Sequence, residues 1–291
     1  MSNKIWEFTG ETKIHSGIIL RRIRATVEFK LRCGTVIRKG EIGGWIEKEP
    51  NLSDNAWVSG NAWVSGNALV YGNALVSGNA WVSGNAEAFG NAKVSGDAKV
   101  YGDAKVYGDA EVYGNALVSG NAKVFDNAEV SGDAEVSGNA KVSDNAWVSG
   151  NAWVSGNALV YGNALVYGDA KVYDNAEAFG NAKVSGDAKV YGDAKVYGDA
   201  EVYGDAWVSG NVEVYGNAWV KSSKDYCVYK NTWSSFRWFT YTRSNKMWKV
   251  GCFYGTGTEL IAKAYKDGEK SGKCYEAIVK AQEAIEKVME V

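Results

Sequence analysis

The chain reads Asn61-Ala62-Trp63-Val64-Ser65-Gly66 within a repeat that decides its fold: Asn or Asp, Ala, a variable residue, Val, Ser or Tyr, and Gly. The repeat runs through 28 consecutive hexads, the first starting at Asn55 and the last at Asn217, with no insertion or deletion. A short fixed period is typical of a solenoid, in which each unit stacks only on its neighbours. We therefore expect residues 55–220 to form one continuous solenoid.

Each hexad has the alternation of a short β-strand followed by a corner. Ala62 and Val64 fall on one side of such a strand, and Trp63 and Ser65 fall on the other. Gly66 and the Asn that follows it suit a corner, because both residue types tolerate the left-handed backbone region. Ala and Val are nearly constant along the repeat, so we expect them to fill the interior.

The hexad also resembles the hexapeptide signature of left-handed parallel β-helices, since Val64 is followed four positions later by the small residue Ala68. In that family three hexads form one triangular coil, so that every eighteenth residue stacks. The resemblance implies a mainly β fold: a single-stranded left-handed parallel β-helix solenoid with terminal modules. It would contain a little more than nine coils and be about 45 Å long, at roughly 4.8 Å per layer.

An internal duplication supports the 18-residue coil. Residues 55–71 read NAWVSGNAWVSGNALVY, and residues 145–161 repeat them without change. The offset between the copies equals five coils of three hexads each, so the copy keeps every side chain on its original face.

Stacking every eighteenth residue predicts an aromatic column along one face. Eight of its nine members are aromatic, and the remaining member is Ser143. The aromatic members are Tyr71, Phe89, Tyr107, Phe125, Tyr161, Phe179, Tyr197 and Tyr215. Stacked rings would cover and stabilise the sheet. They would also suit an oligomer or partner surface. Both interpretations stay open, and they are compatible.

Seven tryptophans fall on the other two faces: Trp57, Trp63, Trp81, Trp147, Trp153, Trp207 and Trp219. Exposed Trp lowers solubility, so we expect burial against another subunit or a terminal module. Stacking on a sugar or nucleic acid is the alternative.

Charge and cysteine content limit the partners. Residues 55–220 contain 9 Lys, 12 Asp and 7 Glu, while the whole chain has a net charge of −2, so the two ends together carry +8. An acidic rod argues against tracking a phosphate backbone and leaves nucleic acid as a candidate ligand at the basic ends only. The four cysteines form no CxxC pair, so we expect no metal and no cofactor. With no signal region or membrane span, we predict a cytoplasmic protein in a bacterial host cell that does not contact a membrane.

Residues 1–54 are predicted to be a β-rich cap. Strands are expected at 18–23 and 25–29. Gly43-Gly44-Trp45-Ile46 is already in phase with the hexads, and Pro50 marks an irregular first coil.

Residues 221–291 are predicted to be a separate α+β module. Its expected strands are 226–230, 236–242 and 247–254, with a turn at 243–246. A helix over 259–266 would take Thr258 as its N-cap. A helix over 274–290 would pack through the stripe of Cys274, Ile278, Ala281, Ile285 and Val288.

The hairpin region of this module combines aromatic and basic residues, as binding hot spots do. We expect Trp238, Trp248 and Phe253 to pack inside the module. The predicted partner-binding residues are Trp233, Arg237, Arg243, Lys246 and Lys249.

The sequence disfavours the known activities of left-handed β-helices. Acyltransferases of that fold use a catalytic His at the coil, whereas His15 is the chain's only His and lies outside the repeat. One His cannot form a three-His zinc site, and residues 55–220 contain no Thr of the kind that ice-binding coils present. We therefore predict no catalytic residues.

The whole chain resembles poorly characterised hexapeptide-repeat proteins of phages and prophages. The resemblance rests on residues 20–25, on residues 39–47 running into 51–53, and on residues 242–257. It brings no established activity.

Three functional hypotheses follow. The first is a non-enzymatic phage-type binding protein whose rod presents terminal modules to a host protein, with inhibition of a host defence component as its suggested effect. The second is a structural or assembly protein that forms homo-oligomers, dimers or trimers, through the rod. The third is an acyltransferase-like enzyme.

Overall fold

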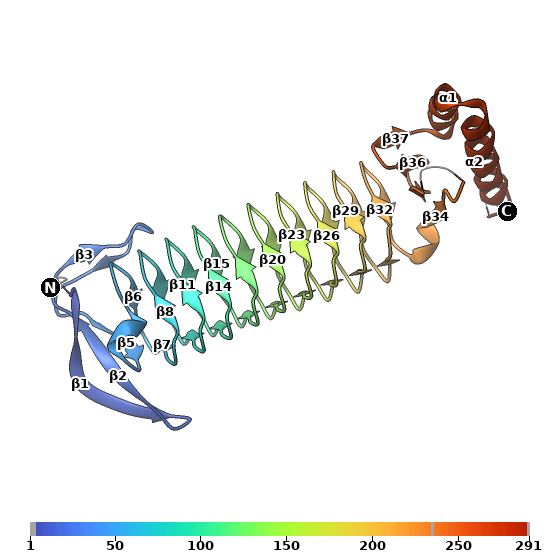
Figure 1. Ribbon diagram of the computed structural model, residues 1–291. Helices are drawn as coiled ribbons and strands as arrows, with labels where there is room; N and C mark the ends of the chain where they lie inside the picture. Colours follow the sequence, from blue (N-terminus) through green and yellow to red (C-terminus); the bar gives the residue numbers. More distant parts are fainter. Residues whose placement is uncertain (1–3, 234–235, 290–291) are drawn as a thin grey trace.

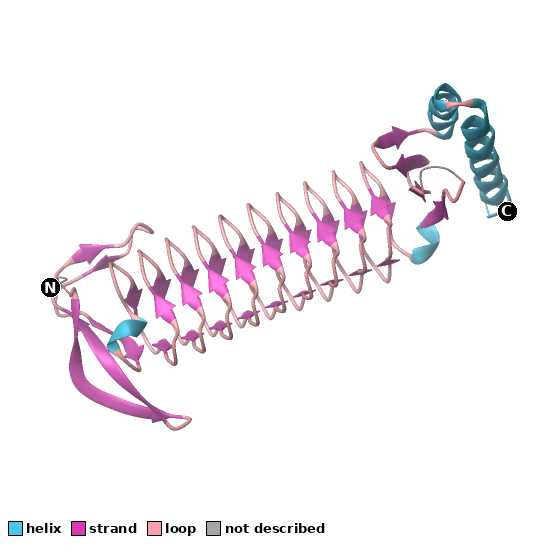
Figure 2. Cartoon of the chain, viewed as in Figure 1, coloured by secondary structure: helices cyan, strands magenta, loops and turns pink. Residues whose placement is uncertain are grey.

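The computed structural model describes residues 4–233 and 236–289. They form a long rod with a β-rich module at its N-terminal end and a module of strands and helices at its C-terminal end (Figure 1). The rod is a parallel β-solenoid of 28 two-residue strands, from β6 (Trp57–Val58) to β33 (Trp219–Val220). Each strand is the third and fourth residue of its hexad, and turns connect successive strands along the whole rod (Figure 2).

Each strand pairs in parallel with the strand three hexads further along. For example, β7 (Trp63–Val64) pairs with β10 (Trp81–Val82), which pairs with β13 (Lys99–Val100). The strands form three sheets, here called face 1 (β7 to β31, Trp207–Val208), face 2 (β8, Leu69–Val70, to β32, Glu213–Val214) and face 3 (β6 to β33). The predicted coil of three hexads, with one face for each hexad, is confirmed.

The interior consists of the Ala and Val of the hexads. From Ala56 to Val220 nearly all of these side chains are fully buried, and Val212, which replaces one Ala, is 2% exposed. The backbone is paired between coils: the Trp63 N–H donates to the Ala80 carbonyl at 3.0 Å, and the Ser65 N–H donates to the Val82 carbonyl at 3.0 Å. Each buried Val contributes about 1.5–2 kcal/mol. The predicted interior is therefore confirmed.

The corners depend on a left-handed residue at the sixth hexad position. Gly138 has φ +67°, and a Cβ placed on it would lie 3.0 Å from both the amide nitrogen and the carbonyl oxygen of Gly156 in the next coil. Aspartate replaces this glycine three times within the repeat, at Asp126, Asp144 and Asp174, with φ of 59–61°. The Asp144 carboxylate accepts the Gly162 N–H at 3.0 Å, so it bonds to the coil above.

The N-terminal module continues face 1 beyond the first coil. β1 (Trp6–His15) and β2 (Ile18–Ala25) form an antiparallel hairpin, and β2 pairs antiparallel with β5 (Ile42–Ile46). β5 then pairs in parallel with β7, with Trp45 opposite Trp63. The solenoid phase therefore begins inside this module, as predicted.

Two details of the module differ from the sequence prediction. β1 is not predicted, because its alternation is mixed with polar residues. The strand predicted over 25–29 is wrong: β2 ends at Ala25, and Phe29 starts the short hairpin of β3 (Phe29–Lys30) and β4 (Val36–Ile37). The irregular first coil is the 3-10 turn η1 (Glu49–Asn51), which contains Pro50.

The C-terminal module follows the 3-10 turn η2 (Ser223–Asp225). An antiparallel sheet of four strands is covered by two helices; in chain order these are β34 (Tyr226–Lys230), β35 (Trp238–Thr242), β36 (Met247–Val250), β37 (Phe253–Gly255), α1 (Gly257–Asp267) and α2 (Glu269–Met289). The first two predicted strands and the turn are found, although the second strand starts at Trp238 instead of residue 236. The third predicted strand is two strands, joined by a turn at Gly251 and Cys252.

The helices are shifted from their predicted positions. The N-cap of α1 is Thr256, not Thr258, and Glu259 completes the capping box. α2 starts at Glu269 instead of Cys274, and the predicted end at Glu290 lies outside the described residues. Its predicted packing stripe is only partly right: Ile278 packs against the module core, but Ile285 and Val288 are exposed, whereas Val279 and Gln282 are buried.

Candidate partner-binding surface at the C-terminal junction

The predicted aromatic column is present on face 2 as two stacks of rings. Ring centroids are 4.8 Å apart from Tyr71 to Phe89 and again from Tyr161 to Phe179, with interplanar angles of 2° and 1°. The second stack continues through Tyr197 to Tyr215 and ends edge-on against Tyr254 of the C-terminal module at 4.6 Å. The rings therefore cover each other and join the rod to the module. Their use as an oligomer surface stays a prediction.

Burial and neighbouring glutamates raise the pKa of three tyrosines in the column. The Tyr71 hydroxyl donates to Glu87 at 3.0 Å, and the Tyr161 hydroxyl donates to Glu177 at 3.2 Å. Burial, with the adjacent carboxylate as the next cause, raises the pKa of Tyr71 and of Tyr161 to about 12. At Tyr197 burial and Glu213 raise the pKa further in the same direction.

We expect these tyrosines to make the rod sensitive to alkali. A phenol with a raised folded-state pKa stabilises the fold fully below its unfolded value of about 10, and that stability is lost as the pH rises toward the folded value. The midpoint of denaturation should therefore decrease as the pH rises from about 10 to about 12. The double variant Y71F/Y161F should show a shallower fall, since Phe occupies the same column at Phe89 and Phe179. Equal pH profiles for the two proteins would contradict this explanation.

Lys249, a predicted partner-binding residue, instead fastens the module to the rod. Its ammonium lies 3.4 Å from the Glu213 carboxylate and 5.8 Å from the ring centroid of Tyr215. Beside it the Glu213 N–H donates to the Thr240 hydroxyl at 3.1 Å. Lys249 therefore contacts the last coil of the rod, and its use in partner binding stays a prediction.

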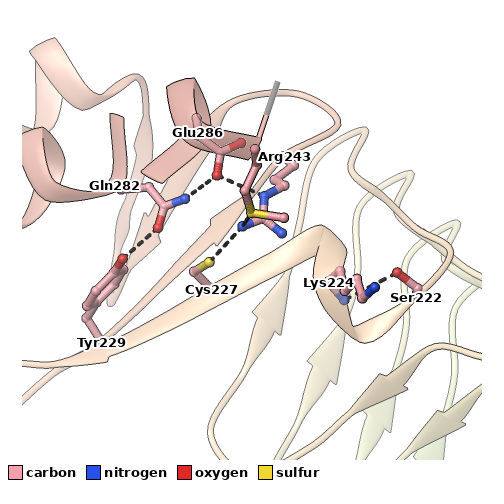
Figure 3. Close-up of polar contacts among 8 residues, drawn as sticks. Ser222, Lys224, Cys227, Tyr229, Arg243, Gln282 and Glu286 are labelled. Carbon is pink, nitrogen blue, oxygen red and sulfur yellow. Dashed lines mark hydrogen bonds and ion pairs between the residues drawn. The ribbon is translucent and has the colours of Figure 1, made fainter. Parts of the chain in front are cut away.

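Arg243, also predicted to bind a partner, holds α2 against the sheet. Its Nε lies 2.8 Å from Glu286, which also accepts a hydrogen bond from Gln282 (Figure 3). Gln282 accepts the Tyr229 hydroxyl at 2.6 Å, so a polar line connects the sheet to the helix. This line explains the orientation of α2: a stripe defined by apolar residues alone does not include Gln282 and Glu286.

The other three predicted residues lie at the surface of the module. Arg237 and Lys246 are exposed, and Trp233 is partly buried with its ring edge-on to Tyr275 of α2 at 6.4 Å. Arg237 approaches Gly251 in the turn between β36 and β37.

Both the last coil and the adjoining module carry exposed aromatic side chains. Trp219 is 58% exposed, Phe236 65% and Trp238 37%. The sequence predicts that Trp238 packs inside, and that prediction is wrong; Trp248 is buried and Phe253 packs against the module core, as expected. The sequence carries one signal for Trp219: it is the variable residue of the last hexad, so no further coil covers it.

A groove lies where the last coil of the rod meets the C-terminal module. It has a volume of about 530 Å³ and is lined by Asn217, Trp219, Ser244, Asn245, Met247 and Tyr254. The Trp219 N–H donates to the Ser244 hydroxyl at 2.7 Å, and the Asn245 amide donates to the Asn217 side chain at 3.2 Å. We name the exposed set of Trp219, Phe236, Arg237, Trp238 and Lys246 the junction surface. Trp219 lines the groove, whereas Trp238 lies at the start of β35, opposite Lys230 of β34.

Side chains that could bind a metal ion do not converge in the described parts of the chain. Within residues 4–233 and 236–289, no three His, Cys, Asp or Glu side chains gather in a way that would hold a metal ion. His15 lies at the tip of the β1–β2 hairpin, edge-on to Trp63 at 4.2 Å. In the same residues, no helix combines the length and the apolar character that a membrane crossing requires.

Comparison with known families concerns the repeat. A family model described as the YdcK beta solenoid repeat matches residues 62–78, 68–84 and 152–168. The first two matches are offset by one hexad, and the third lies five coils after the first, in the duplicated copy. No curated protein matches the chain. The matches and the fold together identify the chain as a repeat protein built on a parallel β-solenoid.

Proposed function

We propose that this chain is a non-enzymatic binding protein whose rod holds the junction surface toward a host protein. The observations that support the proposal are three exposed aromatic side chains: Trp219 in the last coil, and Phe236 and Trp238 in the module that is fastened to it. Aromatic and Arg side chains dominate the binding energy of many protein interfaces, especially where polar groups surround them. Arg237 and Lys246 are the polar groups of the junction surface.

The junction is suited to binding because it is held in place before any partner arrives. Lys249, Thr240, Asn245 and Tyr254 of the module all contact the last coils of the rod. A preformed surface loses little conformational freedom on binding, which favours affinity. The exposed cations favour a partner whose surface has acidic side chains around an apolar centre.

The resemblance to phage and prophage proteins suggests the source of that partner. A phage accessory protein acts inside a bacterial host, and occlusion of a host protein requires only a binding surface. We therefore propose a host protein, with a defence component as the preferred candidate. The absence of an enzyme role is part of this proposal and is supported by the position of His15, which lies against Trp63.

The test is capture from a bacterial host lysate with the full chain as bait. We expect the triple variant W219S/F236S/W238S to reduce capture of the specific partner by at least about tenfold, because truncating hot-spot residues typically costs about 2 kcal/mol or more each. The control is Y101S/Y167S, which removes two exposed aromatic rings from the rod, 38% and 40% exposed. Both variants should melt close to the unmodified protein.

Point variants are preferable to removal of the module. Tyr254 packs against the corner at Gly216, so a chain ending at residue 220 would uncover the last coil. Equal capture by the triple variant and the control would refute the junction surface as the binding site.

A further inference from the structure

The duplication places the same tryptophan pair in two different environments. Trp57 and Trp63 open the first copy of NAWVSGNAWVSGNALVY, and Trp147 and Trp153 open the second. The first pair is 0% and 8% exposed, whereas the second pair is 42% and 37% exposed. Trp147 and Trp153 lie on faces 3 and 1 on either side of the corner at Asn151, and we name them the Trp edge.

The N-terminal module accounts for the difference. Phe29 lies edge-on to Trp57 with ring centroids 5.8 Å apart, and His15 lies edge-on to Trp63 at 4.2 Å. Leu20 of β2 is fully buried in a cluster with Trp45 and Trp63. The first tryptophan pair is therefore a docking site for a β-hairpin module, and its occupant is part of the same chain.

We propose that the Trp edge is the docking site for the N-terminal module of a second copy of this chain. The β1–β2 hairpin has an uncovered apolar side: Ile14 and Ile19, a cross-strand pair, are 76% and 49% exposed. One chain therefore carries both an open Trp edge and an open aliphatic hairpin face.

The two surfaces cannot meet within one chain. The Trp edge lies five coils beyond the pair that the module covers, which is about 24 Å along the rod. The hairpin lies at the N-terminal end, and its strand β2 is anchored to β5 (Figure 1). Contact therefore requires two chains.

Charge favours an antiparallel pair over a parallel chain of molecules. In a parallel arrangement shifted by five coils, Lys93 and Lys99 of one copy would approach their duplicates Lys183 and Lys189 of the other. In an antiparallel arrangement Lys93 of one copy approaches Glu111 of the other, its ion-pair partner within the chain at 2.5 Å. The antiparallel pair also closes, because each copy supplies one hairpin and one Trp edge.

Sedimentation equilibrium of the full chain tests the proposal. We expect the mass to rise with concentration from 31.4 kDa to twice that value and then to stop. Both W147K/W153K and I14K/I19K should remain monomeric, because each removes one partner of both contacts in the pair. W207K is the control: Trp207 is also an exposed tryptophan of the rod, at 50%, and this variant should dimerise normally.

Mixing the two monomeric variants distinguishes this contact from other forms of self-association. A mixed pair keeps one intact contact, between the hairpin of W147K/W153K and the Trp edge of I14K/I19K, so dimers should reappear on mixing. Normal dimerisation of I14K/I19K alone would overturn the proposal in favour of a Trp-to-Trp contact. A monomeric wild-type chain, or a mass that keeps growing beyond the dimer, would also overturn it. None of these outcomes depends on the junction surface.

Discussion

Gly138→Val should lower the free energy of unfolding by about 3 kcal/mol or more, whereas Gly138→Asp should lower it by about 1 kcal/mol. The residue has φ +67°, a conformation that a β-branched side chain strongly disfavours. The added Cβ would also lie 3.0 Å from the backbone of Gly156, which is held in the next coil. Val has no means of offsetting either cost.

Aspartate is the appropriate control because the chain already uses it in the same column. Asp174 follows Gly138 by two coils and has φ 61°. Its carboxylate accepts the Gly192 N–H of the following coil at 3.3 Å, which offsets part of the cost. Urea denaturation of both variants, followed by circular dichroism, measures the difference. Equal midpoints for Val and Asp would show that the corner adapts and that stacking of its backbone is less restrictive than the structure implies.

Trp57→Ser should destabilise the chain by about 3–5 kcal/mol, the usual cost of removing a buried large aromatic side chain. Trp147→Ser, the same change in an identical stretch of sequence, should cost about 1 kcal/mol or less. Trp57 is fully buried beneath the N-terminal module, whereas Trp147 is partly exposed and donates a hydrogen bond from Nε1 to Ser131 at 3.0 Å.

The duplication makes this comparison unusually well controlled, since the residue, its repeated neighbours and its position in the coil are shared. Thermal unfolding should be followed at low protein concentration, so that any contact between copies does not contribute. Trp63→Ser and Trp153→Ser form a second pair with the same expected order, although Trp63 also stacks on Trp81, where Trp153 has Lys171 as its neighbour. Equal losses in both pairs would mean that the N-terminal module contributes little to stability.

The repeat could be predicted in detail because its contacts are all of one kind. Trp63 faces Trp81, Tyr71 stacks on Phe89, and the members of both pairs are three hexads apart. Once the period is known, each position has a known face and known neighbours. The interior of Ala and Val, the aromatic column and the start of the phase at Trp45 follow directly.

The terminal modules are predicted less well, since their contacts join residues at irregular separations. The Tyr229–Gln282–Glu286–Arg243 line orients α2 through polar groups, so the apolar stripe through Ile285 and Val288 indicates the wrong face. The sequence gives no ion-pair partner for Lys249 or Arg243. In the structure Lys249 pairs with Glu213, and Arg243 pairs with Glu286. Trp238 precedes four buried residues, but it lies at the start of its strand, where it remains exposed.

The sequence alone determined the coil, its three faces and the column of rings, because a fixed period makes spatial neighbours a matter of counting. It could not distinguish Trp57 from Trp147, since their surroundings in the chain are the same. Only the tertiary structure decided which pair is covered, because the N-terminal module reaches the first copy and ends about five coils short of the second. The same holds for the cations of the C-terminal module, whose exposure depends on which carboxylates the fold brings to them.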